Sequence, residues 1–350
     1  MVRNGPEAQD PSTQGLVPFD LPLTAELLIQ PTSFCNIDCH YCYLPNRQYH
    51  HKLTSQIIDS FCLNVVKYIR WTTHVPITWH LSEPFSREPA FYINSHRRLK
   101  SAFADRGTNV SFVFQTNLTI LNDDWISLLT QEDVSIGISL DGPAFLHNQN
   151  RRYRSGKGTY DTILRNISRL RSEGIRFFIL CVVTADSLRF VDDLIDLFVT
   201  IRPLWVGLLP QQVLTHGQRA SDPRDWLTEA QIMSNFFAAV LRRNSLLSDP
   251  LEIREIATAA TSLGSATPPL RRDNVPFRLI SLHWDGALYT FSPELSQAPP
   301  VRESVCIGST ALQFDYLAAS RRIAATWLAI REGITQCQRN CTFYDFCGGG

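Results

Sequence analysis

From about residue 25 to residue 211, short apolar segments with strand character alternate with longer amphipathic segments with helix character. Parallel strands need long crossover connections, and helices are the usual crossover. The alternation therefore predicts an α/β fold with a parallel sheet and helices outside it. About six strand–helix units fit, which predicts a partial (β/α)6 barrel rather than a closed barrel of eight units. The expected strands are 25–30, 76–81, 109–117, 134–142, 176–184 and 204–211.

The segments between these strands carry helix signals. Their apolar positions recur at helical spacing over 54–69, 89–104 and 159–172, and a further helix is expected to begin at Asp123 or Asp124. Thr54 or Ser55 is expected to cap the first of them. The strands themselves are apolar along nearly their whole length, which is typical of strands with both faces covered.

Composition excludes several classes of protein. The chain has 350 residues, 44% of them hydrophobic, which suffices for a sizeable buried core. The 33 Lys and Arg residues balance the 33 Asp and Glu residues, so net charge does not draw the chain to nucleic acid or to an acidic membrane surface. No apolar run reaches the roughly 20 residues of a membrane span. Residues 1–22 lack the apolar core of a signal peptide, which predicts a flexible tail and a cytoplasmic location.

The pattern changes after residue 220. Residues 227–244 predict one long amphipathic helix, residues 277–295 a hairpin that turns at Asp285-Gly286, and residues 311–330 another helix. This back portion is interpreted as a small separate domain. The expected parts are a flexible tail (1–22), the partial barrel (23–222), a helical bridge (223–275) and a small C-terminal α+β domain (276–350).

Nine cysteines are distributed unevenly along the chain. Cys35, Cys39 and Cys42 lie in one short stretch, CNIDCHYC, just after the first expected strand. In a chain without an export signal, such a cluster more often binds metal than forms disulfides. Cys62 and Cys181 lie inside apolar periodic segments and are interpreted as small buried hydrophobic residues.

The cysteine loop lies where parallel α/β folds bind their ligands, beyond the carboxyl ends of the strands. Three thiolates from one loop hold three irons of a [4Fe–4S] cluster, which normally takes four Cys ligands, and leave one iron free for a small molecule. The alternative is a Cys₃His zinc site in which His40, His50 or His51 supplies the fourth ligand. Structural zinc sites usually combine two such loops, so a single loop favours iron–sulfur.

The spacing Cys-x3-Cys-x-aromatic-Cys, with Tyr41 as the aromatic residue, resembles the signature of the radical S-adenosylmethionine (AdoMet, SAM) enzymes. In that family the free iron chelates the amino and carboxylate groups of AdoMet. The resemblance spans about residues 25–220 and has one motif near each strand end, namely WHLSEP, FQTN, SLDGP and HNQNR. It implies that AdoMet is bound by Tyr41, Glu83, Gln115, Asn117, Ser139, Asp141, Arg151 and Leu180.

The resemblance also implies which part of AdoMet several of these residues contact. Glu83 is expected to bind the amino group, Ser139 and Asp141 the ribose, Arg151 the carboxylate, and Leu180 the adenine. The chain departs from the family at Leu81 and Ser82, where glycine is common. Ser82 is expected to crowd the methionine part of AdoMet.

A second group of cysteines, Cys337, Cys341 and Cys347, follows the last expected helix. Beside a radical SAM domain, this stretch resembles the SPASM/twitch extension of peptide-modifying members, which holds auxiliary [4Fe–4S] clusters. A zinc-ribbon-like site is the alternative. Cys306 is the remaining candidate ligand, so the sequence supplies ligands for one auxiliary [4Fe–4S] cluster at most, and for none if this part of the domain is incomplete.

Together with FSPEL (291–295), the motifs most resemble the maturases of glycine-rich-repeat peptides (GrrM type), some of which form cyclophane carbon–carbon crosslinks. The resemblance implies a radical SAM enzyme that modifies a ribosomally made precursor peptide. It also implies an electron donor such as flavodoxin or ferredoxin and a separate leader-binding protein. No catalytic residue is assigned, although Asp285 and Glu294 are candidate proton acceptors.

Two other interpretations stay open. The first is an anaerobic sulfatase-type maturase, which oxidises a Cys or Ser side chain to formylglycine and uses two complete auxiliary clusters. The shortage of cysteines counts against it. The second is a non-catalytic partner protein that binds zinc or an iron–sulfur cluster, which the departures at Leu81, Ser82 and Asn148 keep open.

Overall fold

The computed structural model describes residues 23–211, 223–265, 267–269, 271–297 and 301–349. The tail predicted at 1–22 lies outside them. Within the described residues, nine strands form one open sheet in the order β6-β5-β4-β3-β2-β1-β7-β8-β9. The strands are β1 (Glu26–Ile29), β2 (His74–Trp79), β3 (Asn109–Thr116), β4 (Val134–Ser139), β5 (Phe177–Val183), β6 (Val206–Pro210), β7 (Leu279–Leu282), β8 (Ala287–Thr290) and β9 (Cys306–Ser309).

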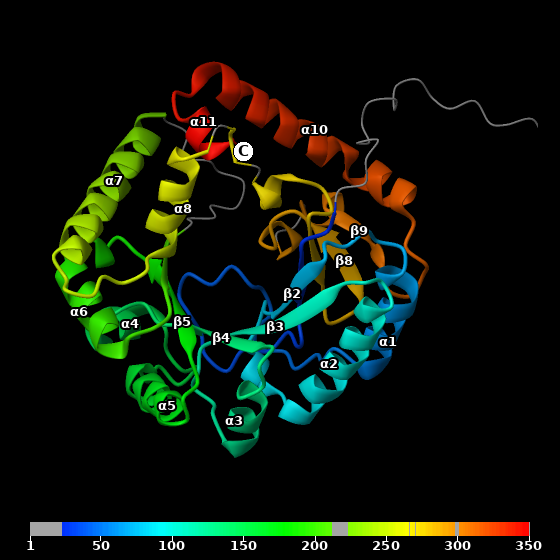
Figure 1. The fold of residues 1–350 in the computed structure, drawn as a ribbon, viewed down its shortest axis with the longest axis horizontal. Coiled ribbons are helices and arrows are strands. Elements are labelled where there is room, and N and C mark those ends of the chain that lie inside the picture. The colour runs from blue at the N-terminus through cyan, green and yellow to red at the C-terminus, as the bar shows by residue number, and fades with distance from the viewer. Residues whose placement is uncertain (1–22, 212–222, 266, 270, 298–300, 350) are drawn as a thin grey trace, which may run out of the picture.

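The first six strands are parallel and are joined by helices, as the alternation in the sequence predicts. Figure 1 shows these helices around the outside of a sheet that curves without closing. The partial barrel is therefore confirmed. The helices are α1 (Ser55–Phe61), α2 (Pro89–Ala104), α3 (Asp123–Leu129), α4 (Ala144–Asn150), α5 (Tyr160–Ser172), α6 (Val191–Ile201), α7 (Pro223–Ser245), α8 (Arg254–Leu263), α9 (Val301–Ser304), α10 (Tyr316–Asn340) and α11 (Tyr344–Cys347).

Helix ends follow local capping chemistry. The Thr54 side chain accepts a hydrogen bond from the amide of Ile57 and caps α1, one of the two expected positions. Helix α3 begins at Asp123, one of the two expected positions, and is capped by Asn122, whose Oδ1 accepts from the amide of Trp125 at 3.0 Å. Asp123 and Asp124 lie in the first turn, where negative charge is favourable.

The C-terminal strands differ from the expectation of a separate domain. Strand β7 pairs in parallel with β1, and β8 and β9 extend the same sheet antiparallel. The hairpin expected at 277–295 therefore forms, with Gly286 at φ +86° in its turn, but it continues the barrel sheet. The last long helix spans Tyr316–Asn340 instead of 311–330. Helix α10 leaves the β9 end of the sheet and leads to α11, which packs against α8 on the β6 side (Figure 1).

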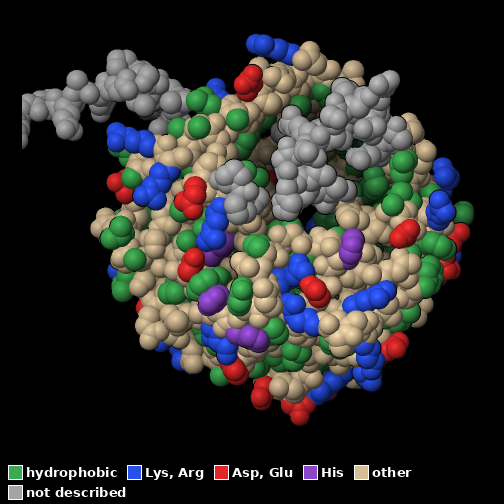
Figure 2. Space-filling model, turned by 180° about the vertical axis from the view of Figure 1, so that it is seen from behind, with side chains coloured by type: hydrophobic (Ala, Val, Ile, Leu, Met, Phe, Trp, Pro, Cys, Tyr) green, Lys and Arg blue, Asp and Glu red, His purple; other side chains and the backbone are tan. Residues whose placement is uncertain are grey.

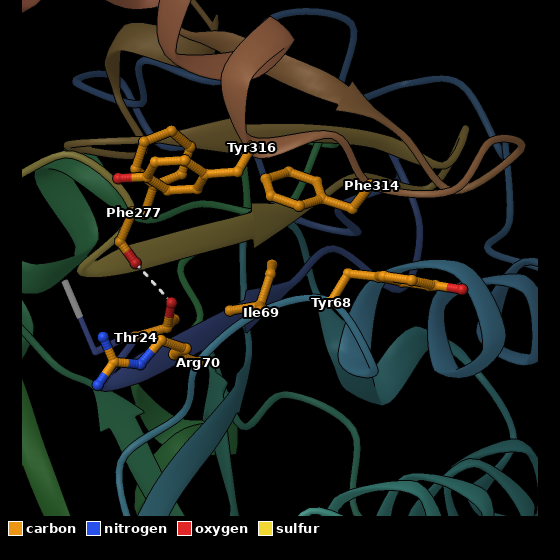
Figure 3. Close-up of a pocket in the computed structure, with 7 residues that line it drawn as sticks. All are labelled: Thr24, Tyr68, Ile69, Arg70, Phe277, Phe314 and Tyr316. Carbon is orange, nitrogen blue, oxygen red and sulfur yellow. Dashed lines mark hydrogen bonds between the residues drawn. The ribbon is translucent and has the colours of Figure 1, made fainter. Parts of the chain in front are cut away.

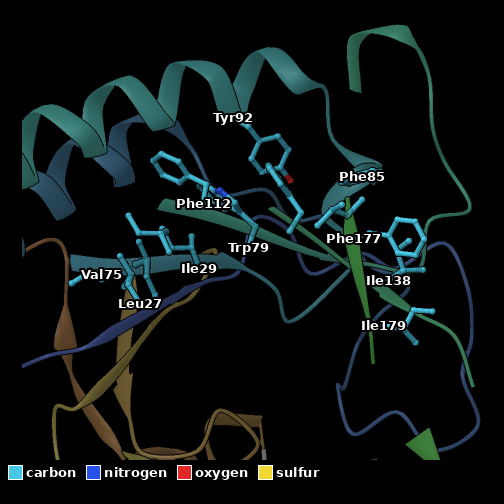
Figure 4. Close-up of a cluster of buried hydrophobic side chains, with 14 of the residues drawn as sticks. Leu27, Ile29, Val75, Trp79, Phe85, Tyr92, Phe112, Ile138, Phe177 and Ile179 are labelled. Atoms are coloured by element: carbon cyan, nitrogen blue, oxygen red, sulfur yellow. The ribbon is translucent and has the colours of Figure 1, made fainter. Parts of the chain in front are cut away.

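The two faces of the sheet have different surroundings. Along β5, buried and half-buried residues alternate, and the same holds over most of β2. The buried set packs under the outer helices, as Figure 4 shows for Trp79 on β2 and Tyr92 on α2. The inward-facing residues of β2 and β5 keep part of their surface exposed, whereas β1 beyond Glu26 and the whole of β7 are buried on both faces, as their apolar sequences predict.

Aromatic packing fixes the outer layer between β2, β3 and α2. The ring of Trp79 lies 4.9 Å from that of Tyr92, edge to face, and its Nε1 donates to Nε2 of His96 at 3.0 Å. His96 in turn stacks on Phe112 at 3.5 Å. Fully burying such a side chain stabilises the fold by about 1.5–3 kcal/mol. This layer holds the carboxyl ends of the strands in place for the site.

Candidate functional site

The first cysteine group lies on the loop that follows β1, as the sequence predicts. Backbone hydrogen bonds tie this loop to segments distant in the sequence. The amide of Cys35 donates to the carbonyl of Arg47 at 2.9 Å, and the amide of Asp38 donates to that of Arg152 at 2.8 Å. The guanidinium of Arg154 donates to the carbonyl of Cys35 at 3.0 Å. The loop is thus positioned by the chain itself.

The three thiols lie close enough to influence one another. Burial raises the pKa of Cys35, and the charges of Glu83 and of the other two thiols raise it further. Burial likewise raises the pKa of Cys39 to about 11. Thiols in this state ionise when a bound cation supplies positive charge. Among the described residues, no group of three or more His, Cys, Asp or Glu side chains is arranged to hold a metal ion. One buried thiol (Cys39) and two half-buried thiols on one loop are nevertheless the donor types that a [4Fe–4S] cluster with one open iron needs.

Tyr41, Asp141 and Arg151 form one buried network beside these thiols. One carboxylate oxygen of Asp141 accepts from the hydroxyl of Tyr41 and, at 2.8 Å, from Nε of Arg151. The other accepts from the amide of Val182 at 2.9 Å. The Asp141 side chain is only 2% exposed. Its carboxylate therefore joins the cysteine loop to β4 and β5, and both its oxygens already accept hydrogen bonds from the protein.

Arg151 continues this network to the cluster loop. Its Nη1 lies 3.9 Å from Sγ of Cys39, within reach of a weak hydrogen bond to sulfur. Its positive charge lowers the pKa of Cys39 against the larger effect of burial. The resemblance implied that Arg151 faces the carboxylate of AdoMet; in the structure the guanidinium faces the thiol of Cys39, a predicted ligand of the cluster. Arg151 thus stabilises the thiolate form that an iron needs.

Glu83 lies on the loop after β2 and is 1% exposed. One of its oxygens accepts from the amide of Phe85 at 2.8 Å and from the hydroxyl of Thr116 at 2.6 Å. The other accepts from the amide of Asn117 at 2.8 Å. Burial raises its pKa to about 7 although these three hydrogen bonds lower it. A carboxylate has about four acceptor positions, so one remains for an amino group.

Gln115, Asn117, Ser139 and Leu180 complete the predicted set along the neighbouring strands. Nε2 of Gln115 donates to Oγ of Ser139 at 2.9 Å, and Ser139 is in register with Leu180 on β5. Nδ2 of Asn117 lies 3.9 Å from Sγ of Cys35. All eight residues expected to bind AdoMet thus lie at or near the carboxyl ends of β1 to β5, around the cysteine loop. Their contacts with AdoMet stay a prediction.

Of the two departures from the family pattern, Leu81 and Ser82, the structure explains the first. Leu81 has φ +64°, in the left-handed region that favours glycine, and it is fully buried. Nε2 of Gln30 donates to its carbonyl at 2.8 Å and holds this turn. Oγ of Ser82 is buried and finds no hydrogen-bond partner in the described part of the chain. Sequence reasoning missed Gln30 and its neighbour His80, although each follows an outward-facing residue of its strand and so points inward.

The second cysteine group is only partly brought together. Cys337 lies in the last turn of α10, and Cys341 and Cys347 follow the helix, with the guanidinium of Arg271 3.6 Å from Sγ of Cys347. Cys306 lies on β9. Strand β9 adjoins α10 near Thr326, whose hydroxyl donates to the carbonyl of Ser304, and from Thr326 to Cys337 the helix advances about 16 Å. Cys306 is thus placed apart from the other three.

Two hollows lie elsewhere. A cavity of about 10 Å³, enough for one water, lies near the amino end of β1 between Thr24, Ile69 and Phe277 (Figure 3). A shallow hollow of about 260 Å³ borders the amino ends of β5 and β6 near Arg176 and Leu204. Ligands of parallel α/β folds bind at the opposite ends of the strands, so neither hollow belongs to this site.

Charge on the surface is mixed. Figure 2 shows basic and acidic side chains interspersed on the face opposite that of Figure 1, with no large area of one sign.

Among the described residues, no helix is both long and apolar enough to cross a bilayer.

The fold and the cysteine loop define an α/β enzyme that binds its cofactors at the carboxyl ends of an open parallel sheet. A model of the radical SAM superfamily matches residues 29–197. This match covers just under half of the chain and supports an enzyme of this superfamily, which uses a [4Fe–4S] cluster and AdoMet. The radical SAM enzyme predicted from the motif is confirmed by this match.

Relatives match this chain over different lengths. An uncharacterised protein of a Synechocystis strain is 26% identical over 330 residues, covering 93% of this chain and 82% of that protein. The serine-type anaerobic sulfatase-maturating enzyme of Bacteroides thetaiotaomicron is 26% identical over 210 residues, covering 57% of this chain and 49% of that enzyme. The cysteine-type enzyme of Clostridium perfringens is 27% identical over 49% of this chain and 48% of its own length. The two maturases are therefore matched over about half of their length.

Solved structures share the fold over nearly the whole chain. The structure of anSMEcpe with bound AdoMet superposes with a TM-score of 0.76 at 18% identity, covering 93% of this chain and 88% of that one. The same enzyme with AdoMet and the Cp18Cys peptide gives 0.77. Streptococcus suis SuiB bound to its precursor peptide SuiA gives 0.60 at 12% identity, covering 86% of this chain and 67% of that one. At these identities the likeness shows the fold.

Proposed function

We propose that this radical SAM enzyme modifies a ribosomally made precursor peptide and closes a carbon–carbon crosslink of the cyclophane type. The observation that carries a peptide substrate is the inner wall of the open sheet. Four residues that form part of this wall are uncharged and keep part of their surface exposed, namely Thr78, Val113, Phe178 and Val182. These uncharged, partly exposed side chains beside the cysteine loop suit contact with an extended peptide.

The chemistry divides between the cofactors and the chain. The cluster and AdoMet together supply a carbon-centred radical that takes a hydrogen atom from an unactivated carbon. The chain's residues hold these groups. Cys35, Cys39 and Cys42 ligate the cluster, Arg151 favours the thiolate of Cys39, and Glu83 offers an acceptor to the amino group of AdoMet. The buried outer layer keeps the strand ends rigid during the reaction.

The placement of the remaining cysteines supports a crosslink over formylglycine formation. The latter was expected to need two complete auxiliary clusters. Cys337, Cys341 and Cys347 lie at the C-terminal end of α10, whereas Cys306 lies on β9, which adjoins α10 near Thr326, about 16 Å of helical rise before Cys337. We propose one auxiliary cluster at most, held by the three C-terminal cysteines and a ligand other than Cys306. A flavodoxin or ferredoxin is the proposed electron donor, and a separate protein is the proposed carrier of the peptide leader.

A second candidate function is formylglycine formation on a sulfatase-like peptide. It is favoured by the sequence similarity to serine-type and cysteine-type sulfatase-maturating enzymes and by the fold shared with a peptide-bound anSMEcpe. The two functions leave different marks on a peptide. A crosslink removes two hydrogen atoms and joins two residues, whereas formylglycine creates an aldehyde.

The test uses the anaerobically reconstituted protein with AdoMet and a reductant. One arm contains the short peptide encoded next to this chain's reading frame, and the other contains the Cp18Cys peptide. Mass spectrometry after proteolysis separates a crosslinked pair from an aldehyde trapped with a hydrazide. A crosslink in the first arm supports the proposal. An aldehyde in the second arm with no crosslink in the first overturns it in favour of the second candidate.

A further inference from the structure

Four polar side chains form one row on the inner face of the sheet. The pairs Ile29–Trp79, Ile29–Leu282 and Trp79–Phe114 set the register of four neighbouring strands, and all four residues are fully buried on the outer face. Because side chains alternate between the faces of a strand, the next residue of each strand points inward. These residues are His283, Gln30, His80 and Gln115, in the order β7, β1, β2 and β3.

Backbone hydrogen bonds continue the register through this row. The amide of His80 donates to the carbonyl of Ile29 at 3.0 Å, and the amide of Gln30 donates to the carbonyl of Leu282 at 2.8 Å. Gln30 and His80 are therefore direct neighbours, separated by the strand spacing of about 4.8 Å.

Two side chains of the row present unused hydrogen-bonding atoms. Gln30 is 5% exposed, and Nε2 donates to the carbonyl of Leu81, which fixes the orientation of its amide. Its Oε1 is buried and has no partner within the described residues. Nδ1 of His80 is likewise buried without a partner in that part of the chain. Buried polar atoms of native proteins nearly always have a partner, so these two atoms point to a ligand.

The row is electrically neutral. Burial lowers the pKa of His80 to about 4. Burial also lowers the pKa of His283 to about 4, and Ser296 and Gln297 contact its Nε2. Both imidazoles are neutral at pH 7, and each then has one donor and one acceptor. Gln30 adds a fixed acceptor. A neutral row with both donors and acceptors suits an uncharged polar group and disfavours a carboxylate.

We propose that Gln30 and His80 bind an uncharged amide group of the peptide substrate at the inner wall of the barrel. The amide N–H donates to Oε1 of Gln30, and the amide oxygen accepts from the imidazole N–H of His80. In a primary carboxamide one N–H and the oxygen point to the same side, so both can bind side chains on adjacent strands, whereas in a trans backbone amide they point in opposite directions and only one of the two contacts forms. The inference rests on the proposed peptide substrate. It makes both residues specificity-determining, since a group of another charge leaves their buried atoms unpaired.

The test measures binding without turnover. The probes are N-acetyl-asparagine N′-methylamide, its aspartate counterpart and N-acetyl-alanine N′-methylamide, added to the anaerobic holoenzyme with AdoMet and without reductant. Dissociation constants come from saturation-transfer NMR. The asparagine probe is expected to bind more tightly than the aspartate probe. Equal binding of the asparagine and alanine probes assigns the contact to a backbone amide, and tighter asparagine binding assigns it to a side-chain carboxamide.

Variants decide between a specific site and general affinity. His80→Phe is expected to weaken binding of the better amide probe about tenfold, the loss of one buried hydrogen bond. Gln30→Met is expected to do the same. His74→Phe is the matched control, because His74 begins the same strand and is exposed. Its binding of the probe is expected to equal that of the unchanged protein.

Iron content and AdoMet binding of each variant show whether it has kept its fold. A variant that keeps both but binds the probe weakly has lost the proposed site alone. Should Gln30→Met lose AdoMet because the turn at Leu81 shifts, His80→Phe decides alone, since the imidazole of His80 does not brace that turn. The proposal is overturned if the asparagine and aspartate probes bind equally, or if His80→Phe binds like His74→Phe. Because no probe is turned over, these results do not depend on whether the crosslinking assay succeeds.

Discussion

The replacement Arg151→Met tests whether the network behind the cysteine loop is buried and coupled. The Arg151 and Asp141 side chains are 10% and 2% exposed, and Nε lies 2.8 Å from the carboxylate. Removing one partner of such a pair costs about 3–5 kcal/mol of unfolding free energy, because a buried charge is left behind. Asp141 keeps its hydrogen bonds from Tyr41 and Val182, which places the expected loss near the lower end, at about 3 kcal/mol.

The matched control is Arg169→Met. Arg169 pairs with Asp123 at the surface, where the side chains are 37% and 92% exposed, so its loss should cost about 0–1 kcal/mol. Urea unfolding of the apoprotein, followed by tryptophan fluorescence, measures both variants. The reasoning fails if Arg151→Met is destabilised no more than Arg169→Met. Iron content after reconstitution gives a second measure, because Arg151 also faces Cys39, and only the Arg151 variant should incorporate less iron.

Three further predictions address other parts of the site. Gly137→Ala should cost about 1–3 kcal/mol in urea unfolding, since its new Cβ would lie 2.3 Å from Oε1 of Gln115 and 2.3 Å from a ring carbon of Phe178. Glu83→Gln should flatten the pH dependence of the free energy of unfolding. Folding raises the pKa of the Glu83 carboxyl from 4.5 to about 7, so the stability that this group contributes is fully present below about pH 4.5 and falls by about 3 kcal/mol as the pH rises to 7. Urea midpoints across this pH range measure the difference between the variant and the unchanged protein. Cys306→Ala should leave the iron content after reconstitution unchanged, whereas alanine at Cys337, Cys341 or Cys347 should lower it. Iron loss in Cys306→Ala would refute the placement of Cys306 apart from these three cysteines.

The parallel sheet and the cluster loop could be predicted from the sequence because both signals are local. Strand–helix alternation is visible within windows of a few residues, and Cys35, Cys39 and Cys42 lie within one loop. The pairing of β7 with β1 was missed for the opposite reason. These strands lie some 250 residues apart in the sequence, and the local sequence of a hairpin does not indicate which edge of a sheet it will pair with.

The site residues could be located from the sequence, but their partners could not. The motif after β4 placed Asp141 at the correct strand end and assigned it to a ribose. In the fold, that carboxylate meets Tyr41 from the cysteine loop and Arg151 from the segment after α4. Its hydrogen bonds depend on the distances between three loops, and those distances follow from the packing of the sheet, which no local pattern encodes.

Leu81 illustrates how such packing replaces a residue that a motif favours. A left-handed conformation costs a non-glycine residue about 1–2 kcal/mol. Full burial of a leucine side chain contributes about 1.5–3 kcal/mol, and the hydrogen bond from Gln30 to the Leu81 carbonyl contributes about 1 kcal/mol more. The gains offset the cost, so the turn keeps its shape without glycine. The departure from the family pattern is therefore compensated by Gln30, whose Oε1 has no partner among the described residues. The turn at Leu81 and the inner wall of the barrel thus depend on the same side chain.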